Sequence, residues 1–301
     1  MSQRSLRREQ KTEIWVVPGE EEDVNVGVPA EGPVRVVQLP VFKGLYAREQ
    51  DAPVMWATGK PVADPGRVWQ ALAGKHPDTG LVPIVLGFLD GGHTGRPWDN
   101  AEFGLRCDLA AVARLDAAAV LAGQWAAVVP AQGELESDPD LAAILAPYGE
   151  QFPGLAPAQE QALTGAELAA GLGWLGPARM GLVPAARPAD VLARAGYHGT
   201  ANRYGTAEPL CAVLRSWEDR FGAVLAEVGF AHIRILARRP PRTLPHAQAV
   251  AAELWTMCDQ FWPIDHHGQA LHDIGSIAKS ILDIPIWPLW LDQSVSSRSR
   301  G

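Results

Sequence analysis

Apolar residues recur every three or four positions between Leu210 and Gly229, and this spacing predicts one amphipathic helix over 210–229. The opposite side of this helix carries four charged residues close together: Arg215, Glu218, Asp219 and Arg220. We expect Arg215 to reach Glu218 and Asp219, which follow it by three and four positions. Gly229 is the expected C-cap, because glycine readily adopts the left-handed conformation that ends many helices.

Short apolar runs alternate with helical patterns through the rest of the C-terminal half. The resulting order, β-α-α-β-α-α-β, predicts an α/β or α+β layer fold for this part of the chain. The expected strands are 179–184, 232–237 and 286–291, and the expected helices are 188–195, 210–229, 243–261 and 269–282.

The N-terminal half is organised around one strongly apolar run. Residues Leu81 to Leu89 combine β-branched side chains with the length of a strand, which indicates a buried strand. Pro65 opens a helix that continues to Leu72, since proline is favoured in the first helical turn. The other expected elements are strands at 14–17, 34–42 and 53–57 and an alanine-rich helix at 109–127.

The length of 301 residues predicts about two domains, both of mixed α and β layers. A stretch rich in proline and glycine separates them and contains one short helix, 164–172. The expected division is a disordered tail at 1–12, an N-terminal α+β domain at 13–130, the connection at 131–175, a C-terminal domain at 176–293 and a second disordered tail at 294–301.

Charge and composition exclude several functional classes. The net charge of −8 argues against a nucleic-acid binder and against attachment to an anionic membrane surface. No run approaches the roughly 18 apolar residues of a membrane span. The first residues, MSQRSLRREQK, have no apolar stretch of a secretory signal, and three widely separated cysteines fit a reducing compartment. We therefore expect a cytoplasmic protein.

Several phrases of the C-terminal half resemble DUF4253, a family of bacterial proteins without an assigned function. They are RMGLVPAARPAD (179–190), LRSWEDRFGAVLAEVGF (214–230), RRPPRTLPHAQAVAAEL (238–254) and WPLWLD (287–292). Upstream, HPDTGLVPIVL (76–86) and GRPWDNAEF (95–103) resemble the region that often precedes this domain in actinobacteria. The segment 255–267, WTMCDQFWPIDHH, departs from the family pattern. The resemblance implies a fold and a bacterial origin but no chemistry.

Two motifs that suggest ligands have the wrong context or spacing. Residues 171–176 spell G-x-G-x-x-G, but the expected helix precedes them and the expected strand follows, the reverse of a dinucleotide site. His266, His267 and His272 lack the i, i+4 spacing of a helical zinc pair. We therefore expect neither a cofactor nor a metal ion. A cluster of arginines, Arg234, Arg238, Arg239 and Arg242, leaves phosphate contact open.

His93, Arg96 and Asp99 form the catalytic candidate, in the loop after the most apolar strand. Loops at strand ends carry function in many α/β proteins. The three side chains would supply a base, an anion clamp and an orienting carboxylate. The structural alternative, which we favour, is an ion pair of Arg96 with Asp99 while Trp98 fills the core.

A binding surface is the second candidate. Exposed tryptophans are common in protein interfaces, and two tryptophans three apart on a strand face opposite sides, which leaves room for one to be exposed. The alternative, which we favour, is a core role for both. The candidate binding residues are Arg215, Glu218, Asp219, Trp287, Trp290 and Asp292.

These patterns favour a binding or accessory protein, of immunity-like or regulatory type, with a protein partner. The alternative is a hydrolase-like enzyme whose cleft lies between the two domains and joins His93, Arg96 and Asp99 to Glu218 or Asp219. A concave pocket with a perturbed titratable group would indicate the enzyme, and a flat patch the binding protein.

Overall fold

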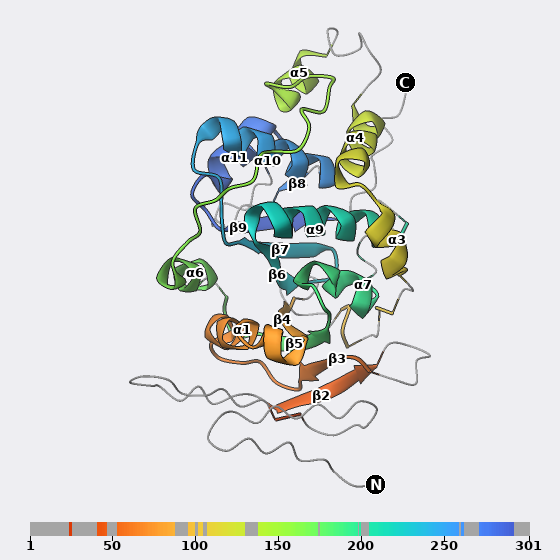
Figure 1. Ribbon diagram of the computed structural model, residues 1–301, viewed down its shortest axis with the longest axis vertical. Helices are drawn as coiled ribbons and strands as arrows, with labels where there is room; N and C mark the ends of the chain where they lie inside the picture. The colour runs from red at the N-terminus through yellow and green to blue at the C-terminus, as the bar shows by residue number, and fades with distance from the viewer. Residues whose placement is uncertain are drawn as a thin grey trace.

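A single mixed β-sheet crosses the protein, as the computed structural model shows (Figure 1). The structure describes residues 24–25, 41–46, 53–87, 96–99, 102–104, 107–129, 138–173, 175–197, 199, 205–258, 260–261 and 271–291. Within these residues the sheet has the strand order β1-β2-β3-β5-β4-β6-β7-β9-β8. The strands are β1 (Val24–Asn25), β2 (Val41–Tyr46), β3 (Pro53–Thr58), β4 (Leu81–Leu86), β5 (Arg179–Pro184), β6 (Ala223–Val228), β7 (His232–Ala237), β8 (Gln260–Phe261) and β9 (Ile286–Trp290).

Helices cover both faces of the sheet. Because side chains alternate along a strand, Ile84 and Leu86 of β4 enter a larger core while Val85 enters a smaller one on the other face. Residues of α9, α10 and α11 belong to the larger core, and residues of α1 and α6 to the smaller. The helices are α1 (Pro65–Ala73), α2 (His76–Thr79), α3 (Leu109–Arg114), α4 (Ala117–Val128), α5 (Pro139–Leu145), α6 (Gly165–Leu172), the 3-10 helix η3 (Pro188–Asp190), α7 (Val191–Ala195), α9 (Glu208–Phe221), α10 (Leu244–Met257) and α11 (Ile274–Ile281).

Strand β4 joins the two halves of the chain. It pairs with β5 on one side in antiparallel orientation and with β6 on the other in parallel orientation, with Val85 opposite Glu227. The predicted mixed α/β class is confirmed. Strands of the predicted segments 13–130 and 176–293 share this one sheet.

The predicted helix over 210–229 is wrong in its second half. Helix α9 ends at Phe221, and Gly222 caps it with φ 60°, the left-handed conformation that glycine adopts without strain. Residues Ala223–Val228 then form β6 between β4 and β7. A central strand is apolar on both faces, so its residues also satisfied the helical spacing. The predicted order β-α-α-β-α-α-β therefore lacks one central strand.

Other helix boundaries differ from the predicted ones for local reasons. The predicted helix 109–127 is two helices, because Asp116 caps a new one by accepting a hydrogen bond from the backbone N–H of Ala119 at 2.8 Å. The predicted helix 243–261 ends at Met257, and the short strand β8 follows. Asp273 likewise begins α11 later than predicted.

The predicted strand 34–42 overlaps β2 (Val41–Tyr46) only at its last two residues, and 34–40 lie outside the described residues. Several other elements agree closely with the sequence-based expectations. Helix α1 and strands β3, β4, β5, β7 and β9 lie where they were predicted. The G-x-G-x-x-G residues follow α6 and precede β5, as expected. The predicted strand 14–17 and both predicted tails lie outside the described residues. None of the helices that the structure describes is long and apolar enough to cross a membrane.

Candidate pocket between α1, α2 and the α9–β6 turn

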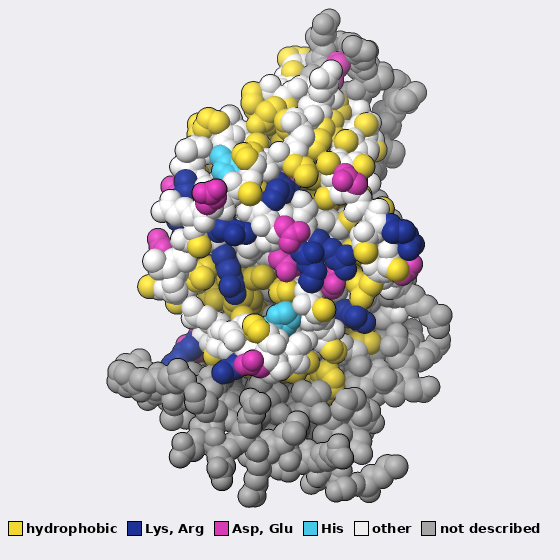
Figure 2. Space-filling model, in the orientation of Figure 1, with side chains coloured by type: hydrophobic (Ala, Val, Ile, Leu, Met, Phe, Trp, Pro, Cys, Tyr) yellow, Lys and Arg dark blue, Asp and Glu magenta, His cyan; other side chains and the backbone are white. Residues whose placement is uncertain are grey.

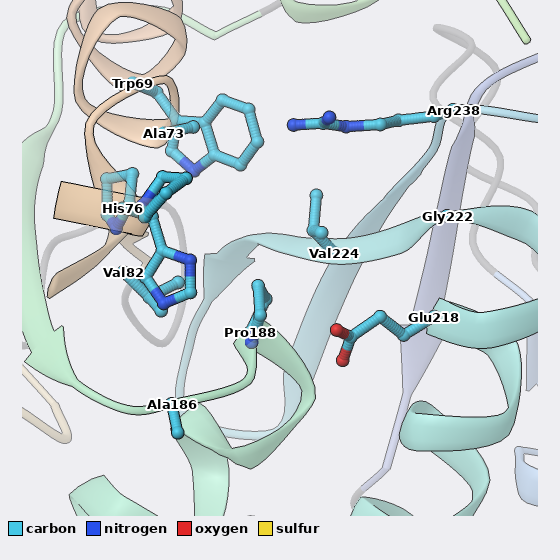
Figure 3. A pocket seen from close by; sticks show the side chains of 12 residues that line it. Trp69, Ala73, His76, Val82, Ala186, Pro188, Glu218, Gly222, Val224 and Arg238 are labelled. Atoms are coloured by element: carbon cyan, nitrogen blue, oxygen red, sulfur yellow. The ribbon is translucent and has the colours of Figure 1, made fainter. Parts of the chain in front are cut away.

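A cavity of about 350 Å³ opens where α1 and α2 approach the turn from α9 to β6 (Figure 3). Its lining comes equally from the predicted N-terminal and C-terminal domains. The lining residues are Trp69, Ala73, His76, Pro77, Val82 and Pro83 from the first, and Ala186, Pro188, Glu218, Gly222, Val224 and Arg238 from the second. Most of the wall is apolar, and a few polar side chains stand at its edges, the usual composition of a small-molecule site.

Trp69 supplies a buried hydrogen-bond donor to this cavity. Helix α1 places it there: Asp64 caps the helix at the backbone N–H of Arg67, and the buried face carries Trp69 inward at 3% exposure. Its Nε1 atom is buried without a hydrogen-bond partner in the described structure. The same is true of Trp56, but only Trp69 lines the cavity. An unpaired buried N–H costs about 1–3 kcal/mol. Nε1 has almost no exposed surface, so an acceptor in the cavity reaches and stabilises it only after a shift of the indole.

His76 supplies the opposite kind of group. Its Nε2 lies 2.8 Å from the carbonyl oxygen of Ala185. A carbonyl only accepts, so Nε2 carries the proton and, in the neutral ring, Nδ1 is left as an acceptor. Helix α2 holds this imidazole on the side of the cavity below Trp69 in Figure 3.

Arg238 follows β7 and extends across the cavity toward Trp69 (Figure 3). Its guanidinium forms no hydrogen bond or ion pair with the part of the chain that the structure describes. Gly222 makes room for its aliphatic part, because a Cβ at that position would stand 3.1 Å from the Cβ of Arg238. Gly222 therefore both ends α9 and permits this position of the arginine.

Glu218 forms the wall opposite Arg238. Its Oε2 accepts hydrogen bonds from the backbone N–H of Ala189 at 3.1 Å and from Nε of Arg187 at 3.4 Å. These contacts hold the carboxylate in place. Among the described residues of the predicted binding set, Glu218 alone lines this pocket.

We expected Arg215 to pair with Glu218 and Asp219 within α9, but the charged side chains pair with other elements. Arg215 forms two hydrogen bonds to the buried Asp190, at 2.7 and 3.0 Å, and Asp219 pairs with Arg187 at 2.6 Å. Figure 2 shows acidic and basic side chains side by side in the middle of the visible face. The physical reason is that η3 and the residue before it place Asp190 and Arg187 next to the charged side chains of α9.

Arg220 points away from this surface network. It forms two hydrogen bonds to Glu253 of α10, which is fully buried. The same carboxylate accepts hydrogen bonds from Nε1 of Trp217 at 2.8 Å and from the backbone N–H of Ala156 at 2.6 Å. Every bond of this group is internal, so Arg220 has a structural role.

The catalytic candidate is not assembled among the described residues. Arg96 donates to both carboxylate oxygens of Glu102, at 2.8 and 2.7 Å, while Asp99 pairs with Arg179. Arg96 and Asp99 thus have separate partners, contrary to the expected pair. Trp98 is buried and donates to the carbonyl oxygen of Gly87 at 2.7 Å, as a core residue. His93 lies outside the described residues.

The two tryptophans of β9 face opposite sides of the sheet, as predicted. Trp287 is fully buried in the larger core. Trp290 is partly exposed and stacks on His232, with ring centroids 6.2 Å apart. Asp292 lies outside the described residues, so the structure does not place the predicted surface as a whole.

A charged cluster that sequence reasoning missed lies beside Trp290. The carboxylate of Glu227 binds Nε2 of His232 at 3.0 Å and the guanidinium of Arg234. Burial alone raises the pKa of Glu227, but the hydrogen bond from His232 and the charge of Arg234 outweigh it and hold the pKa below its usual value. A Cβ at Gly87 would stand 2.6 Å from this carboxylate, so the cluster needs glycine there.

Metal ligands do not gather in the described part of the chain. No group of three or more histidine, cysteine or acidic side chains is placed to hold an ion there. Of the histidines considered, His266 and His267 lie outside the described residues. His272 is described, and its carbonyl oxygen accepts from Nε1 of Trp255 at 2.9 Å.

The fold defines a mixed α/β protein with one sheet and a small pocket where two segments of the chain meet. Residues 179–292 are a DUF4253 domain, a domain of unknown function. This confirms the family resemblance over the residues for which it was predicted. No curated protein and no solved structure matches the chain.

Proposed function

We propose that the protein works by binding a small molecule in the pocket between α1, α2 and the α9–β6 turn. The observation that carries the proposal is the buried, unpaired N–H of Trp69 on the pocket wall. Buried polar groups in folded proteins nearly always have a partner, and a bound ligand would provide one. The sequence favoured binding to a protein partner, so the small-molecule ligand is a new proposal that starts from the pocket. The cytoplasmic location of the protein remains a prediction.

The position of the pocket supports a regulatory use of such binding. Its walls come from α1 and α2 on one side and from α9, β6 and the end of β7 on the other. A ligand that contacts both sides would stabilise their association, because it binds the folded arrangement only. Occupancy of the pocket would then be coupled to the stability of the junction.

A fragment screen by ligand-observed NMR tests this proposal, with neutral, anionic and cationic fragments in equal number. Ala73→Phe places an aromatic ring in the pocket, and Ala119→Phe, at an exposed position of α4, is the matched control. We expect some fragments to bind the native protein and the Ala119→Phe variant but not the Ala73→Phe variant. Binding that all three proteins share equally would show that the pocket is not the site.

A protein partner is the second candidate function, and one observation favours a surface for it. Asp219, with a side chain 68% exposed, and Arg187, 35% exposed, lie in the charge cluster over α9 (Figure 2). Native mass spectrometry of complexes isolated from the host tests this surface. Asp219→Lys is expected to remove a partner mass that the control Asp140→Lys, on α5, retains. Equal retention by both variants contradicts this surface.

A further inference from the structure

We infer that the ligand of this pocket is a small organic acid with one negative charge and an apolar body, a monocarboxylate. The inference rests on the proposed function and adds the chemical class of the ligand. It follows from the two donors, the apolar walls and the acidic residue of the pocket, which are taken in turn.

Arg238 provides the charge for a carboxylate. Its neighbours at the end of β7 are engaged: Arg239 donates to the carbonyl oxygen of Asp219 at 2.8 Å, and Arg242 pairs with Asp283 at 2.8 Å. The guanidinium of Arg238 has no such bond in the described structure and extends over the cavity in Figure 3. The two parallel N–H groups of a guanidinium match the two oxygens of a carboxylate.

Trp69 provides the second donor; its six-membered ring lies nearest the end of the Arg238 side chain, and its Nε1 lies on the other edge of the indole (Figure 3). An indole N–H donates and never accepts, so its partner must be an acceptor on the ligand. Two donors favour an anion over a cation at this end, and the acceptors of the pocket, His76 and Glu218, stand elsewhere on its wall. An unbound Nε1 stays buried and unsatisfied, which increases the advantage of an oxygen-bearing ligand.

The rest of the cavity limits the size and polarity of the ligand. The wall between the polar groups consists of apolar side chains, among them Val82, Pro83, Pro188 and Val224. The volume of about 350 Å³ is near the lower end for ligand pockets, which fits a single ring or a short branched chain.

Glu218 limits the charge. Its carboxylate stands on the wall opposite Arg238, and although Arg187 offsets part of its charge, it disfavours a second anionic group. Dicarboxylates and phosphate dianions would bring such a group into the same small space. A single carboxylate on an apolar body satisfies Arg238 and Trp69 without approaching Glu218.

Three probes of one shape test the charge: benzoate, its neutral counterpart benzamide and its cationic counterpart benzylamine. Inorganic phosphate is the fourth probe. Saturation-transfer NMR and titration are carried out on the native chain. We expect benzoate to bind at least about tenfold more tightly than benzamide, since hydrogen bonds to charged groups contribute about 1.5–3 kcal/mol. We expect no binding of benzylamine and weaker binding of phosphate.

Variants distinguish binding of benzoate in the pocket from unspecific attraction to positive charge. Arg238→Gln removes the positive charge, retains a polar side chain, and is expected to abolish the preference for benzoate over benzamide. Arg239→Gln, one residue further on, is the matched control and keeps that preference. Trp69→Phe retains a ring without the N–H and is expected to weaken benzoate several-fold; if it does not fold, the exposed Arg238→Gln still decides the question.

The outcomes distinguish this inference from the proposed function. Fragments that bind in the pocket with benzamide equal to benzoate, or with no effect of Arg238→Gln, overturn the monocarboxylate while the binding function stands. Tighter binding of phosphate than of benzoate also overturns the monocarboxylate inference and indicates a phosphate ligand. Absence of any pocket binding in the fragment screen removes both proposals together.

Discussion

The guanidinium of Arg220 in α9 meets the fully buried carboxylate of Glu253 in α10 with two parallel hydrogen bonds, Nη1 to Oε1 at 2.7 Å and Nη2 to Oε2 at 2.6 Å. Trp217 and Ala156 donate to the same two oxygens, so each lone pair facing the interior is occupied. Such a group is tolerated in a core only while all of its partners remain. It ties α9, α10 and the segment around Ala156 into one arrangement.

Removal of one partner from this group should therefore destabilise the protein strongly. We expect Arg220→Met to lower the free energy of unfolding by about 3–5 kcal/mol, because Glu253 is left buried and uncompensated. Denaturant unfolding measures the change. The double variant Arg220→Met with Glu253→Met should recover part of the loss, and Arg242→Met, which breaks a more exposed pair with Asp283, should cost less than about 1 kcal/mol. A loss equal to that of Arg242→Met would contradict the structural role.

Gly222 should not tolerate a side chain. It has φ 60° at the end of α9, and a Cβ there would stand 3.1 Å from the Cβ of Arg238. We expect Gly222→Ala to reduce stability by about 1–2 kcal/mol, from left-handed strain and crowding. Gly165→Ala is the control: it lies in α6, nothing is within 4 Å of its Cβ, and alanine is the better helix former there. Thermal melting that falls for Gly165→Ala as much as for Gly222→Ala would refute this explanation.

Glu227 should make the protein sensitive to acid. Its pKa is lower in the folded protein than its usual value, because the hydrogen bond from His232 and the charge of Arg234 outweigh burial. A lowered pKa means stability that is present above the unfolded value of about 4.3 and is lost as the pH falls through the folded value. We expect Glu227→Gln to be less stable than the native protein at pH 6 and to lose less stability between pH 6 and pH 3. Parallel losses over this range would exclude Glu227 as a contributor.

Cys211 should be unreactive in the folded protein. The side-chain hydrogen bond with Cys107, which favours the protonated thiol of Cys211, and burial together raise the pKa of Cys211 well above its usual range, so little thiolate forms at pH 8. Cys107 is partly exposed, and Cys258 is buried. We expect iodoacetamide to modify Cys107 first and to reach the other two only after unfolding, as peptide mass spectrometry would show. Modification of Cys211 at the rate of Cys107 would contradict the buried, hydrogen-bonded thiol.

The charged residues of α9 show how far a candidate site can be predicted from sequence. Their position on a helix was predictable, because the apolar residues up to Phe221 repeat with helical spacing. Their partners were not predictable: Arg215 meets Asp190 and Arg220 meets Glu253, each on a different element. The pocket was equally hidden, since Trp69 and Arg238 belong to opposite halves of the chain, and Arg238 stood out in the sequence only as one member of an arginine cluster.

The sequence by itself determined the local elements and the class of the fold. Some features can be recognised from a few neighbouring residues, without knowledge of tertiary contacts. They are Pro65 at the start of α1, the apolar run of β4 and the phrases of the DUF4253 domain. Only the tertiary structure decided that 223–228 is a strand, that β4 lies between β5 and β6, and which charges pair. A strand buried on both faces loses its alternating pattern, and ion pairs depend on which segments meet in space. Both are properties of the assembled sheet.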